Sequence, residues 1–318
     1  MRLLVTGGCG FIGSNFIKHI LKKYPAYKIV NLDKLTYCGN LCNLSGVEKD
    51  KRYDFVKGDI CDAKIVDKLV KNCDSVINFA AETHVDRSIS NASDFIRTNI
   101  HGVYILLEAA KKHNVRRVIH ISTDEVYGSI NKGSFKESSP LRPNSPYSAA
   151  KAGGDHLAMA YYTTFKTPVI ITRSSNNFGP YQYPEKVIPL FITNLLQNKK
   201  VPLYGDGLNV RDWLYVGDNC AAIDIVLHKG KAGEIYNIGG SFEIPNIELT
   251  KIILKLMGKN DKMINYVTDR LGHDRRYSLD STKVCKLGWK PSRDFNAAIK
   301  ETINWYKANT TWWQKLKI

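Results

Sequence analysis

A glycine-rich turn near the N-terminus constrains the fold of this chain more than any other feature. Residues 2–6 form an apolar run typical of a strand, glycines follow at positions 7, 10 and 13, and a helical pattern then runs to Tyr24. Glycine permits a tight turn and a close approach of the backbone to a pyrophosphate, and a helix N-terminus offers free N–H groups. Strand, turn and helix together predict a dinucleotide-binding unit.

An acidic residue stands where such a unit needs one. Asp33 follows a second apolar run, residues 28–32. A carboxylate there accepts hydrogen bonds from an adenosine ribose and repels a 2′-phosphate, so NAD is expected rather than NADP. The adjacent Lys34 weakens that discrimination. Asp59, after the run 54–57, either contacts the adenine or caps a helix that begins near Asp62.

Alternating strand and helix patterns predict the fold class. Further strand-like runs cover residues 75–79, 117–121 and 168–173, with helical patterns between most of them. We therefore expect an α/β protein with a Rossmann-type, doubly wound parallel sheet. Residues 1–175 form the predicted NAD-binding domain, and segments near 208–240 are expected to return to it. Residues 176–318 mainly form a smaller C-terminal α/β lobe that binds the substrate.

Two adjacent carboxylates follow the strand at 117–121, in the sequence Ser122-Thr123-Asp124-Glu125-Val126-Tyr127-Gly128. Ligands of open α/β sheets bind at the carboxyl ends of the strands. Neighbouring carboxylates repel each other and contribute little to packing. Asp124 and Glu125 are therefore candidates for acid and base chemistry.

Tyr147 and Lys151 are four residues apart on a predicted helix, and so share one face. A lysine ammonium beside a phenol lowers the pKa of the phenol. Tyr147 can then accept a hydroxyl proton while a hydride leaves to a nicotinamide. The alternative is two ordinary residues of an amphipathic helix, but the dinucleotide unit and the strand-end threonine favour the catalytic interpretation.

Charge and composition exclude other classes of protein. The net charge of +16 suggests a nucleic-acid partner, but no nucleic-acid motif accompanies it, and a lysine-rich surface explains it. The seven cysteines are scattered and lack the spacing of metal ligands, so no metal site is expected. With no apolar run of membrane-spanning length and no signal peptide, no membrane association and a cytoplasmic location are expected.

Polar loops in the second half suggest a site for an anionic substrate. Arg211 and Arg275 could each bind a diphosphate through two hydrogen bonds. The alternative for each arginine is a surface ion pair.

Together these motifs resemble the extended short-chain dehydrogenase/reductase superfamily and, within it, the nucleoside-diphosphate-glucose 4,6-dehydratases. The sequence Thr-Asp-Glu-Val-Tyr-Gly at 123–128 is the most specific part. The motifs that carry the resemblance span nearly the whole chain: Gly7–Gly13, Asp33–Tyr37, Ala80–Ser88, Ser122–Gly128, Tyr147 with Lys151, Asn176–Gln182, Arg211–Val216 and Gly272–Tyr277.

The resemblance implies a lyase that uses tightly held NAD and regenerates it in each turnover. Tyr147, activated by Lys151, removes the proton of the glucose 4-hydroxyl as a hydride passes to NAD, and Thr123 bonds the developing ketone. Glu125 then removes the proton on carbon 5, and protonated Asp124 donates to the departing 6-hydroxyl. Hydride return to carbon 6 gives a 4-keto-6-deoxy sugar nucleotide, an intermediate in deoxysugar biosynthesis, most commonly of rhamnose.

The resemblance also implies binding residues and an assembly. A homodimer through two helices, about 91–113 and 147–166, is expected. The cofactor positions are Gly7, Gly10, Phe11, Ile12, Gly13, Asp33, Lys34, Leu35, Thr36, Asp59, Ile60, Phe79, Ala80, Ala81, Thr98, Tyr147, Lys151 and Asn177. The nucleotide-sugar positions are Thr83, Thr123, Asn176, Lys186, Val187, Pro202, Leu203, Tyr204, Arg211, Asn246, Asp269, Arg270, Gly272 and His273.

Two positions depart from the family pattern, and several alternatives stay open. Cys38 replaces the usual alanine, and Leu271 replaces a proline, so that loop lacks the rigidity a proline would give it. A UDP-glucose 4,6-dehydratase, or a UDP-sugar 4-epimerase or decarboxylase of the same superfamily, would share the oxidation step. A non-catalytic NAD-sensing or nucleic-acid-binding Rossmann protein would not need Thr123, Tyr147 and Lys151 together.

Overall fold

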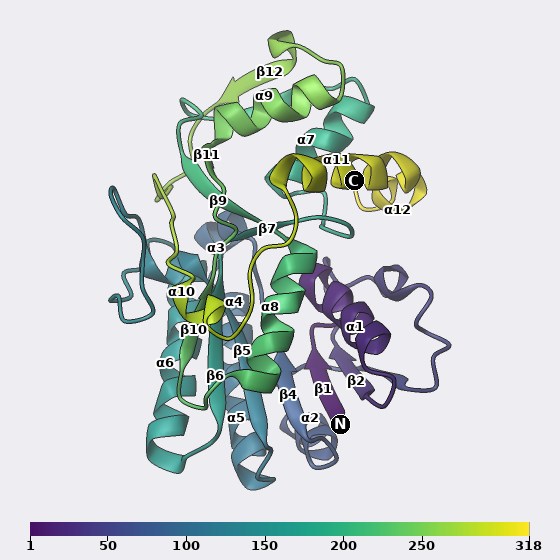
Figure 1. Ribbon diagram of the computed structural model, residues 1–318, viewed down its shortest axis with the longest axis vertical. Coiled ribbons are helices and arrows are strands. Elements are labelled where there is room, and N and C mark those ends of the chain that lie inside the picture. Colours follow the sequence, from purple (N-terminus) through teal and green to yellow (C-terminus); the bar gives the residue numbers. More distant parts are fainter. Residues whose placement is uncertain (318) are drawn as a thin grey trace.

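A parallel seven-stranded sheet lies at the centre of the computed structural model, which describes residues 1–317 (Figure 1). The strand order is β10-β6-β5-β4-β1-β2-β3. This order confirms the predicted Rossmann-type, doubly wound sheet. The strands are β1 (Arg2–Thr6), β2 (Lys28–Asp33), β3 (Tyr53–Lys57), β4 (Ser75–Asn78), β5 (Arg117–Thr123), β6 (Val169–Ser174) and β10 (Ile235–Ile238).

Helices cover both faces of this sheet, because its strands are apolar on both sides. On β1, Leu3 and Val5 face one hydrophobic cluster while Leu4 faces the other. The first cluster includes residues of α1 (Phe11–Lys23) and α8 (Val216–Lys229). The second includes residues of α2 (Ala63–Val70), α5 (Val103–Lys112) and α6 (Pro146–Phe165).

The helical stretch before α5 is less regular than the sequence pattern predicts. It consists of α3 (Val85–Ser90), α4 (Ser93–Ile96) and the π-helical segment η2 (Arg97–Gly102). The amide of Asn99 bonds both the backbone N–H and the carbonyl oxygen of Glu82, each at 3.0 Å. These bonds tie η2 to the loop after β4, a connection that sequence periodicity does not reveal.

A smaller lobe sits at the carboxyl edge of the large sheet (Figure 1). A three-stranded sheet joins β11 (Glu243–Pro245), β9 (Val210–Tyr215) and β7 (Asn176–Phe178), and a second pairs β12 (Ile264–Val267) with β8 (Val201–Tyr204). Its helices are α7 (Val187–Leu196), α9 (Asn246–Leu256), α11 (Phe295–Ala308) and α12 (Thr310–Gln314), and the short η4 (Asp261–Met263) leads into β12. Short segments elsewhere are η1 (Leu41–Leu44), η3 (Asp124–Tyr127) and α10 (Thr282–Cys285).

The chain returns from the lobe to the large sheet through α8 and β10. Asp224 on α8 is fully buried and accepts from Lys23 Nζ at 2.6 Å and from Tyr24 Oη at 2.9 Å, both at the end of α1. Although burial acts against it, hydrogen bonds from His19, Lys23 and Tyr24 lower the pKa of Asp224 to about 2. This charged contact holds α8 beside α1, the helix that begins at the glycine-rich turn.

Within residues 1–317, no helix combines the length and apolar character needed to span a bilayer.

Candidate active site

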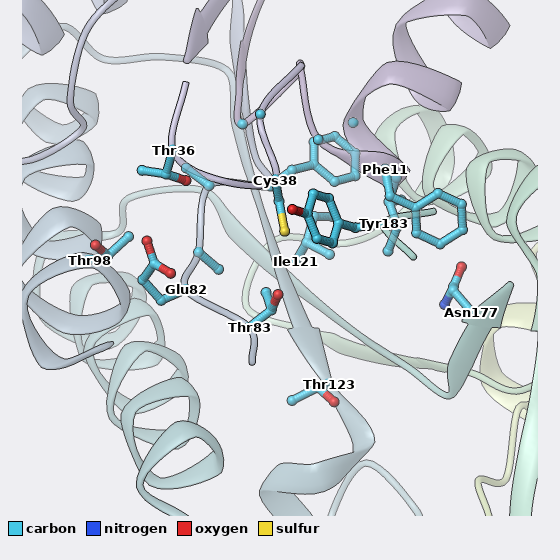
Figure 2. A pocket seen from close by; sticks show the side chains of 18 of the residues that line it. Phe11, Thr36, Cys38, Glu82, Thr83, Thr98, Ile121, Thr123, Asn177 and Tyr183 are labelled. Carbon is cyan, nitrogen blue, oxygen red and sulfur yellow. The ribbon is translucent and has the colours of Figure 1, made fainter. Parts of the chain in front are cut away.

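One large pocket lies at the carboxyl ends of the parallel strands, between the sheet and the smaller lobe. It opens where β1 lies beside β4, the point at which the strand order reverses and where ligands of such sheets bind. Figure 2 shows Thr123 at the end of β5, Asn177 on β7, and Thr36, Glu82 and Thr98 from the loops and helical segment around them.

The glycine-rich turn forms a cradle that side chains would fill. Gly7 has a φ of 68°, and a Cβ there would lie 2.6 Å from the backbone nitrogen of Ala80. A Cβ on Gly13 would lie 2.5 Å from the carbonyl oxygen of Gly7. The N-cap of α1 makes no side-chain hydrogen bond, and its first turn carries no acidic residue. The free N–H groups and the positive end of the helix dipole therefore suit a diphosphate.

Asp33 is held at the end of β2 by backbone donors. Its Oδ2 accepts from the N–H of Cys9 at 2.8 Å, and its Oδ1 accepts from the N–H of Leu35 at 2.8 Å. Burial raises the pKa of Asp33, and these hydrogen bonds oppose that rise. The fixed carboxylate lines the pocket and keeps lone pairs for ribose hydroxyls.

The alternative role considered for Asp59 is wrong. Asp62, not Asp59, caps α2, through hydrogen bonds from the N–H groups of Lys64 and Ile65. Asp59 lines the pocket, accepts from Cys61 N–H at 2.9 Å and pairs with Lys34 Nζ at 3.0 Å. Lys34 is thus engaged by a carboxylate beside the site expected for the ribose.

Most of the predicted cofactor positions come together in this pocket. Leu35 is the exception: it does not line the pocket, and its backbone instead holds Asp33. The predicted cofactor positions that line it are Gly7, Gly10, Phe11, Ile12, Gly13, Asp33, Lys34, Thr36, Asp59, Ile60, Phe79, Ala80, Ala81, Thr98, Tyr147, Lys151 and Asn177.

Several lining residues are absent from the predicted site. Glu82 and Gln182 belong to motifs that carried the resemblance, so their neighbours gave a signal for them. Tyr181 lies in the same motif as Gln182, whereas Tyr183 follows it, and only the fold brings Tyr183 to the pocket. Cys38 also lines it, with its pKa raised to about 12, by burial first and also by Glu185. The other unpredicted lining residues are Leu32, Gly39, Gly58, Ile121, Ser122, Ser174 and Ser175.

The two adjacent carboxylates sit in η3, a short 3-10 turn directly after β5. Thr123 Oγ1 donates to Asp124 Oδ1 at 3.1 Å and accepts from the N–H of Glu125 at 3.3 Å. Asp124 is only 2% exposed, and its Oδ2 has no hydrogen-bond partner. An unpartnered buried carboxylate oxygen is costly, which favours protonation of that oxygen.

The surroundings of the two carboxylates differ in charge. Burial, and then the neighbouring Glu125, raise the pKa of Asp124 well above its usual range. Burial also raises the pKa of Glu125, but Arg270, Arg211 and Lys186 act in the opposite direction. Asp124 is therefore the member that holds a proton more strongly, and Glu125 is the member that ionises more readily.

The tyrosine and lysine reach the pocket from the first turns of α6. Ser145 and Ser148 form a capping box that starts this helix, and Ser88 Oγ accepts from the N–H of Tyr147 at 3.1 Å. Lys151 is 4% exposed, and its Nζ donates to the carbonyl oxygen of Ile121 at 2.6 Å. Both side chains thus lie beside Thr123 at the end of β5.

The sequence predicts a lowered pKa for Tyr147, and this prediction is wrong, because the structure raises that pKa. Burial, and then the Glu125 carboxylate, raise the pKa of Tyr147. Burial also lowers the pKa of Lys151 to about 8, so its stabilising charge is lost as the pH rises through that value. Positive charge beside Tyr147, such as that of an oxidised nicotinamide, is needed to reverse this balance.

The predicted substrate residues divide into two groups. Thr83, Thr123, Asn176 and Lys186 line the main pocket, and Lys186 Nζ donates to the carbonyl oxygen of Thr83 at 3.0 Å. The remainder belong to the smaller lobe and lie outside the lining of this pocket: Val187, Pro202, Leu203, Tyr204, Arg211, Asn246, Asp269, Arg270, Gly272 and His273.

The two candidate arginines for a diphosphate have different environments. Arg211 is 5% exposed, donates to the carbonyl oxygen of Asp274 at 2.9 Å and lies over the ring of Tyr277. Arg275 instead makes two exposed bonds to Asp206, at 2.9 and 3.0 Å, which is the surface ion pair considered as its alternative. Leu271, in the same region, is 77% exposed.

Among residues 1–317, no group of three or more His, Cys, Asp or Glu side chains has metal-site geometry.

Comparisons with known proteins agree with this geometry. A family model described as GDP-mannose 4,6 dehydratase matches residues 4–302. A dTDP-glucose 4,6-dehydratase of Streptomyces niveus is 52% identical over 322 residues, which cover 100% of this chain and 96% of that protein.

Solved structures share the fold along nearly the whole chain. DesIV, a dTDP-glucose 4,6-dehydratase from Streptomyces venezuelae with NAD and dTDP bound, matches with a TM-score of 0.98 and 52% identity. The match covers 99% of this chain and 100% of that one. A UDP-glucuronic acid 4-epimerase from Bacillus cereus matches with a TM-score of 0.91 but 29% identity, covering 97% of this chain and 99% of that one.

Replacing Gly7 by alanine is expected to abolish dinucleotide retention. The new Cβ would meet Ala80 at 2.6 Å, in addition to the cost of a positive φ, about 1–2 kcal/mol. Gly133→Ala is the matched control, because Gly133 has a φ of 75° and no atom within 4 Å of a built Cβ. Dinucleotide content and thermal unfolding of both variants measure the difference; equal dinucleotide retention in the two would contradict the cradle.

Proposed function

The chain belongs to the GDP-mannose 4,6 dehydratase family, and within that family we infer that it is an NAD-dependent dTDP-glucose 4,6-dehydratase. The observation that carries this inference is the pair Asp124 and Glu125, held in one turn beside Thr123 in the pocket that Tyr147 and Lys151 also line. Oxidation alone needs no such pair, whereas elimination of water needs an acid and a base.

The chain's residues fit NAD in the pocket. The glycine cradle and the start of α1 suit the diphosphate, and Asp33 suits the adenosine ribose. When bound, NAD would supply a reversible hydride acceptor, with the hydride coming from carbon 4 of the glucose and returning to carbon 6. All other steps fall to the protein.

Tyr147 begins the reaction as a general base. It takes the proton of the 4-hydroxyl, and the ammonium of Lys151 stabilises the resulting phenolate. Thr123 Oγ1 donates to the oxygen that becomes the 4-ketone. In the structure this hydroxyl donates to Asp124 Oδ1, and the same O–H can donate to the substrate oxygen instead.

Elimination follows because the ketone acidifies the proton on carbon 5. Glu125 removes this proton, supported in its ionised state by Arg270, Arg211 and Lys186. Asp124 donates a proton to the departing 6-hydroxyl, supported in its protonated state by burial and by the charge of Glu125. The different environments of the two carboxylates support this division of roles.

The smaller lobe is proposed to bind the nucleotide diphosphate. Arg211, Arg270 and Lys186 act on the charge of Glu125 from this side of the pocket, and the same cations suit an anionic substrate. In this proposal residues 1–175, with α8 and β10, form the NAD-binding domain, and most of residues 176–318 form the substrate lobe. Packing of α8 against α1 and pairing of β10 with β6 support that division.

The rival activities differ in what they require. A 4-epimerase or a decarboxylase would also use Tyr147 and Lys151 for oxidation. Neither activity eliminates water, so neither would need the acid and base pair of Asp124 and Glu125. The identity to dTDP-glucose 4,6-dehydratases, 52%, also exceeds the 29% to the UDP-glucuronic acid 4-epimerase. A UDP-glucose 4,6-dehydratase differs only in the base that it accepts.

We further propose a homodimer through α5 and α6. Ile96, Tyr104 and Phe165 are 54%, 40% and 50% exposed on α4, α5 and the end of α6. Burying exposed apolar side chains of this kind stabilises a dimer. Sedimentation at micromolar concentration tests the assembly, and a monomer at all concentrations would exclude it.

The seven free cysteines suit a reducing cytoplasm, which cell fractionation tests.

The protein is expected to convert dTDP-glucose into dTDP-4-keto-6-deoxyglucose without added reductant. Product formation is measured by mass spectrometry and by the absorbance of the 4-keto sugar, with UDP-glucose assayed in parallel. Interconversion of UDP-glucose and UDP-galactose, with no deoxy product from either substrate, would contradict the proposed function.

Glu125→Gln is expected to oxidise carbon 4 but to lose elimination, with kcat reduced about 10²–10⁴-fold. Reduced nicotinamide should accumulate on the protein when dTDP-glucose is added, because the ketone forms and proceeds no further. Normal dehydration by this variant would show that Glu125 is not the base.

Asp124→Asn is the matched comparison for Glu125→Gln. This variant keeps the base, so the hydrogen on carbon 5 of the bound 4-keto sugar should still exchange with deuterated water while loss of the 6-hydroxyl is slowed. Glu125→Gln should not exchange it. Identical exchange in the two variants would contradict the separate roles.

A further inference from the structure

A cluster of buried titratable side chains lies close to Lys151 and outside the lining of the pocket. It consists of Asp155 on α6, His120 on β5 and Arg173 on β6, which are 1%, 1% and 3% exposed. None of the three lines the pocket. Charged groups are rarely buried unless they are paired, so this cluster needs a physical explanation.

Asp155 is only partly satisfied by its neighbours. Its Oδ2 accepts from Arg173 Nε at 2.9 Å. Its Oδ1 has no hydrogen-bond partner, and the Nε2 of His120 lies 3.5 Å from it. A buried carboxylate oxygen without a partner is uncommon, so it calls for an explanation beyond the joining of α6 to β6.

The imidazole of His120 cannot neutralise this carboxylate. Burial, and then the charges of Lys151 and Arg173, hold the pKa of His120 well below its usual range. Asn78 Oδ1 accepts from Thr6 Oγ1 at 2.6 Å, which directs its amide nitrogen to the Nδ1 of His120 at 3.2 Å. The neutral ring therefore carries its hydrogen on Nε2, the atom nearest Asp155.

Of the two buried cations near this carboxylate, Arg173 bonds it directly, whereas Lys151 donates to the carbonyl oxygen of Ile121. Asp155 lies four residues after Lys151, one helical turn away on the same face of α6. Arg173 bonds Asp155 and also donates to Tyr127 Oη at 2.8 Å, with its guanidinium over the Tyr127 ring. Asp155 is the group that raises the pKa of Lys151, in opposition to the burial that lowers it to about 8.

We propose that Asp155 is a positioning residue that keeps the amine of Lys151 protonated, and that Arg173 limits how much of its charge reaches that amine. This proposal deepens the proposed function, on which it rests, because the ammonium of Lys151 matters only where Tyr147 must become a phenolate. Asp155 does not line the pocket. Its charge also raises the pKa of Tyr147, so its support for a phenolate has to come through Lys151.

The charges around Lys151 give the direction of each effect. Asp155 acts on Lys151 from one turn further along α6, and Lys151 and Arg173 both act on His120 of β5. Tyr147, Asp124 and Glu125 line the same pocket as Lys151. The ammonium is present below the pKa of Lys151 and is lost as the pH rises through it. Removing the Asp155 carboxylate lowers the pKa of Lys151, so the ammonium is lost at lower pH. Removing the Arg173 guanidinium raises that pKa, so the ammonium is lost at higher pH.

The test compares Asp155→Asn with Arg173→Gln, both as holoenzymes that contain the dinucleotide. The titration of the Lys151 amine is followed by NMR on protein with isotope-labelled lysine, its signal assigned with Lys151→Arg. Asp155→Asn is expected to shift the midpoint down by about one pH unit, and Arg173→Gln to shift it up. The high-pH limb of kcat should move in the same two directions, with KM unchanged.

Asp67→Asn is the control for loss of one negative charge, because Asp67 is 37% exposed and pairs with Lys112 and His113 on the surface. It should shift neither curve. If Asp155 only joins α6 to β6, both cluster variants lower the thermal unfolding temperature and leave the Lys151 midpoint in place, which overturns the proposal. Shifts in the same direction overturn it also.

The NMR titration does not depend on the identity of the reaction. Opposite shifts of the Lys151 midpoint in a protein that fails to dehydrate dTDP-glucose would support the electrostatic role and reject the proposed function. Absence of the shifts in an active dehydratase would reject only the role of Asp155. Should Asp155→Asn fail to fold, the upward shift expected of Arg173→Gln still decides.

Discussion

Repulsion between two adjacent carboxylates in a buried turn is the constraint around which the site is built. Asp124 and Glu125 cannot both ionise there at low cost, since Asp124 is buried and Glu125 is only partly exposed. The structure resolves the conflict by asymmetry. Asp124 is enclosed and has one oxygen without a partner, while Glu125 faces the cations of the smaller lobe. An acid and a base can then operate at the same pH within one turn of chain.

The parallel sheet makes this arrangement possible, because it brings the ends of β1, β2, β4, β5 and β6 to one edge. The glycine cradle follows β1, Asp33 ends β2, and Thr123 ends β5. Tyr147 and Lys151 come from α6, which packs beside β5, and Lys151 bonds the backbone of that strand directly. Outside the pocket, Asp155 pairs with Arg173 and raises the pKa of Lys151.

The parts of the site that the sequence predicts are those in which local chain geometry determines position. Strand, glycine turn and helix determine the cradle, and the strand-end position determines where Thr123, Asp124 and Glu125 lie. Other predictions fail where long-range packing decides. Asp59 and Asp62 are three residues apart, and only the fold shows that Asp62 caps α2. The pKa of Tyr147 depends on its burial and on Glu125, more than 20 residues away in the chain.

The smaller lobe is the least predictable part for the same reason. Arg211 and Arg275 look alike in the sequence, yet one is buried over Tyr277 and the other pairs with Asp206 on the surface. The cluster of His120, Asp155 and Arg173 combines residues of two strands and a helix, so no sequence motif predicts it.

The central claim is that one pocket carries oxidation, elimination and reduction on a single bound sugar. The most direct test uses dTDP-glucose with deuterium on carbon 4 and locates the label in the product by NMR. The account predicts deuterium in the methyl group at carbon 6, because the hydrogen removed in the first step is returned in the last. A deoxy product with no deuterium in its methyl group would contradict the account.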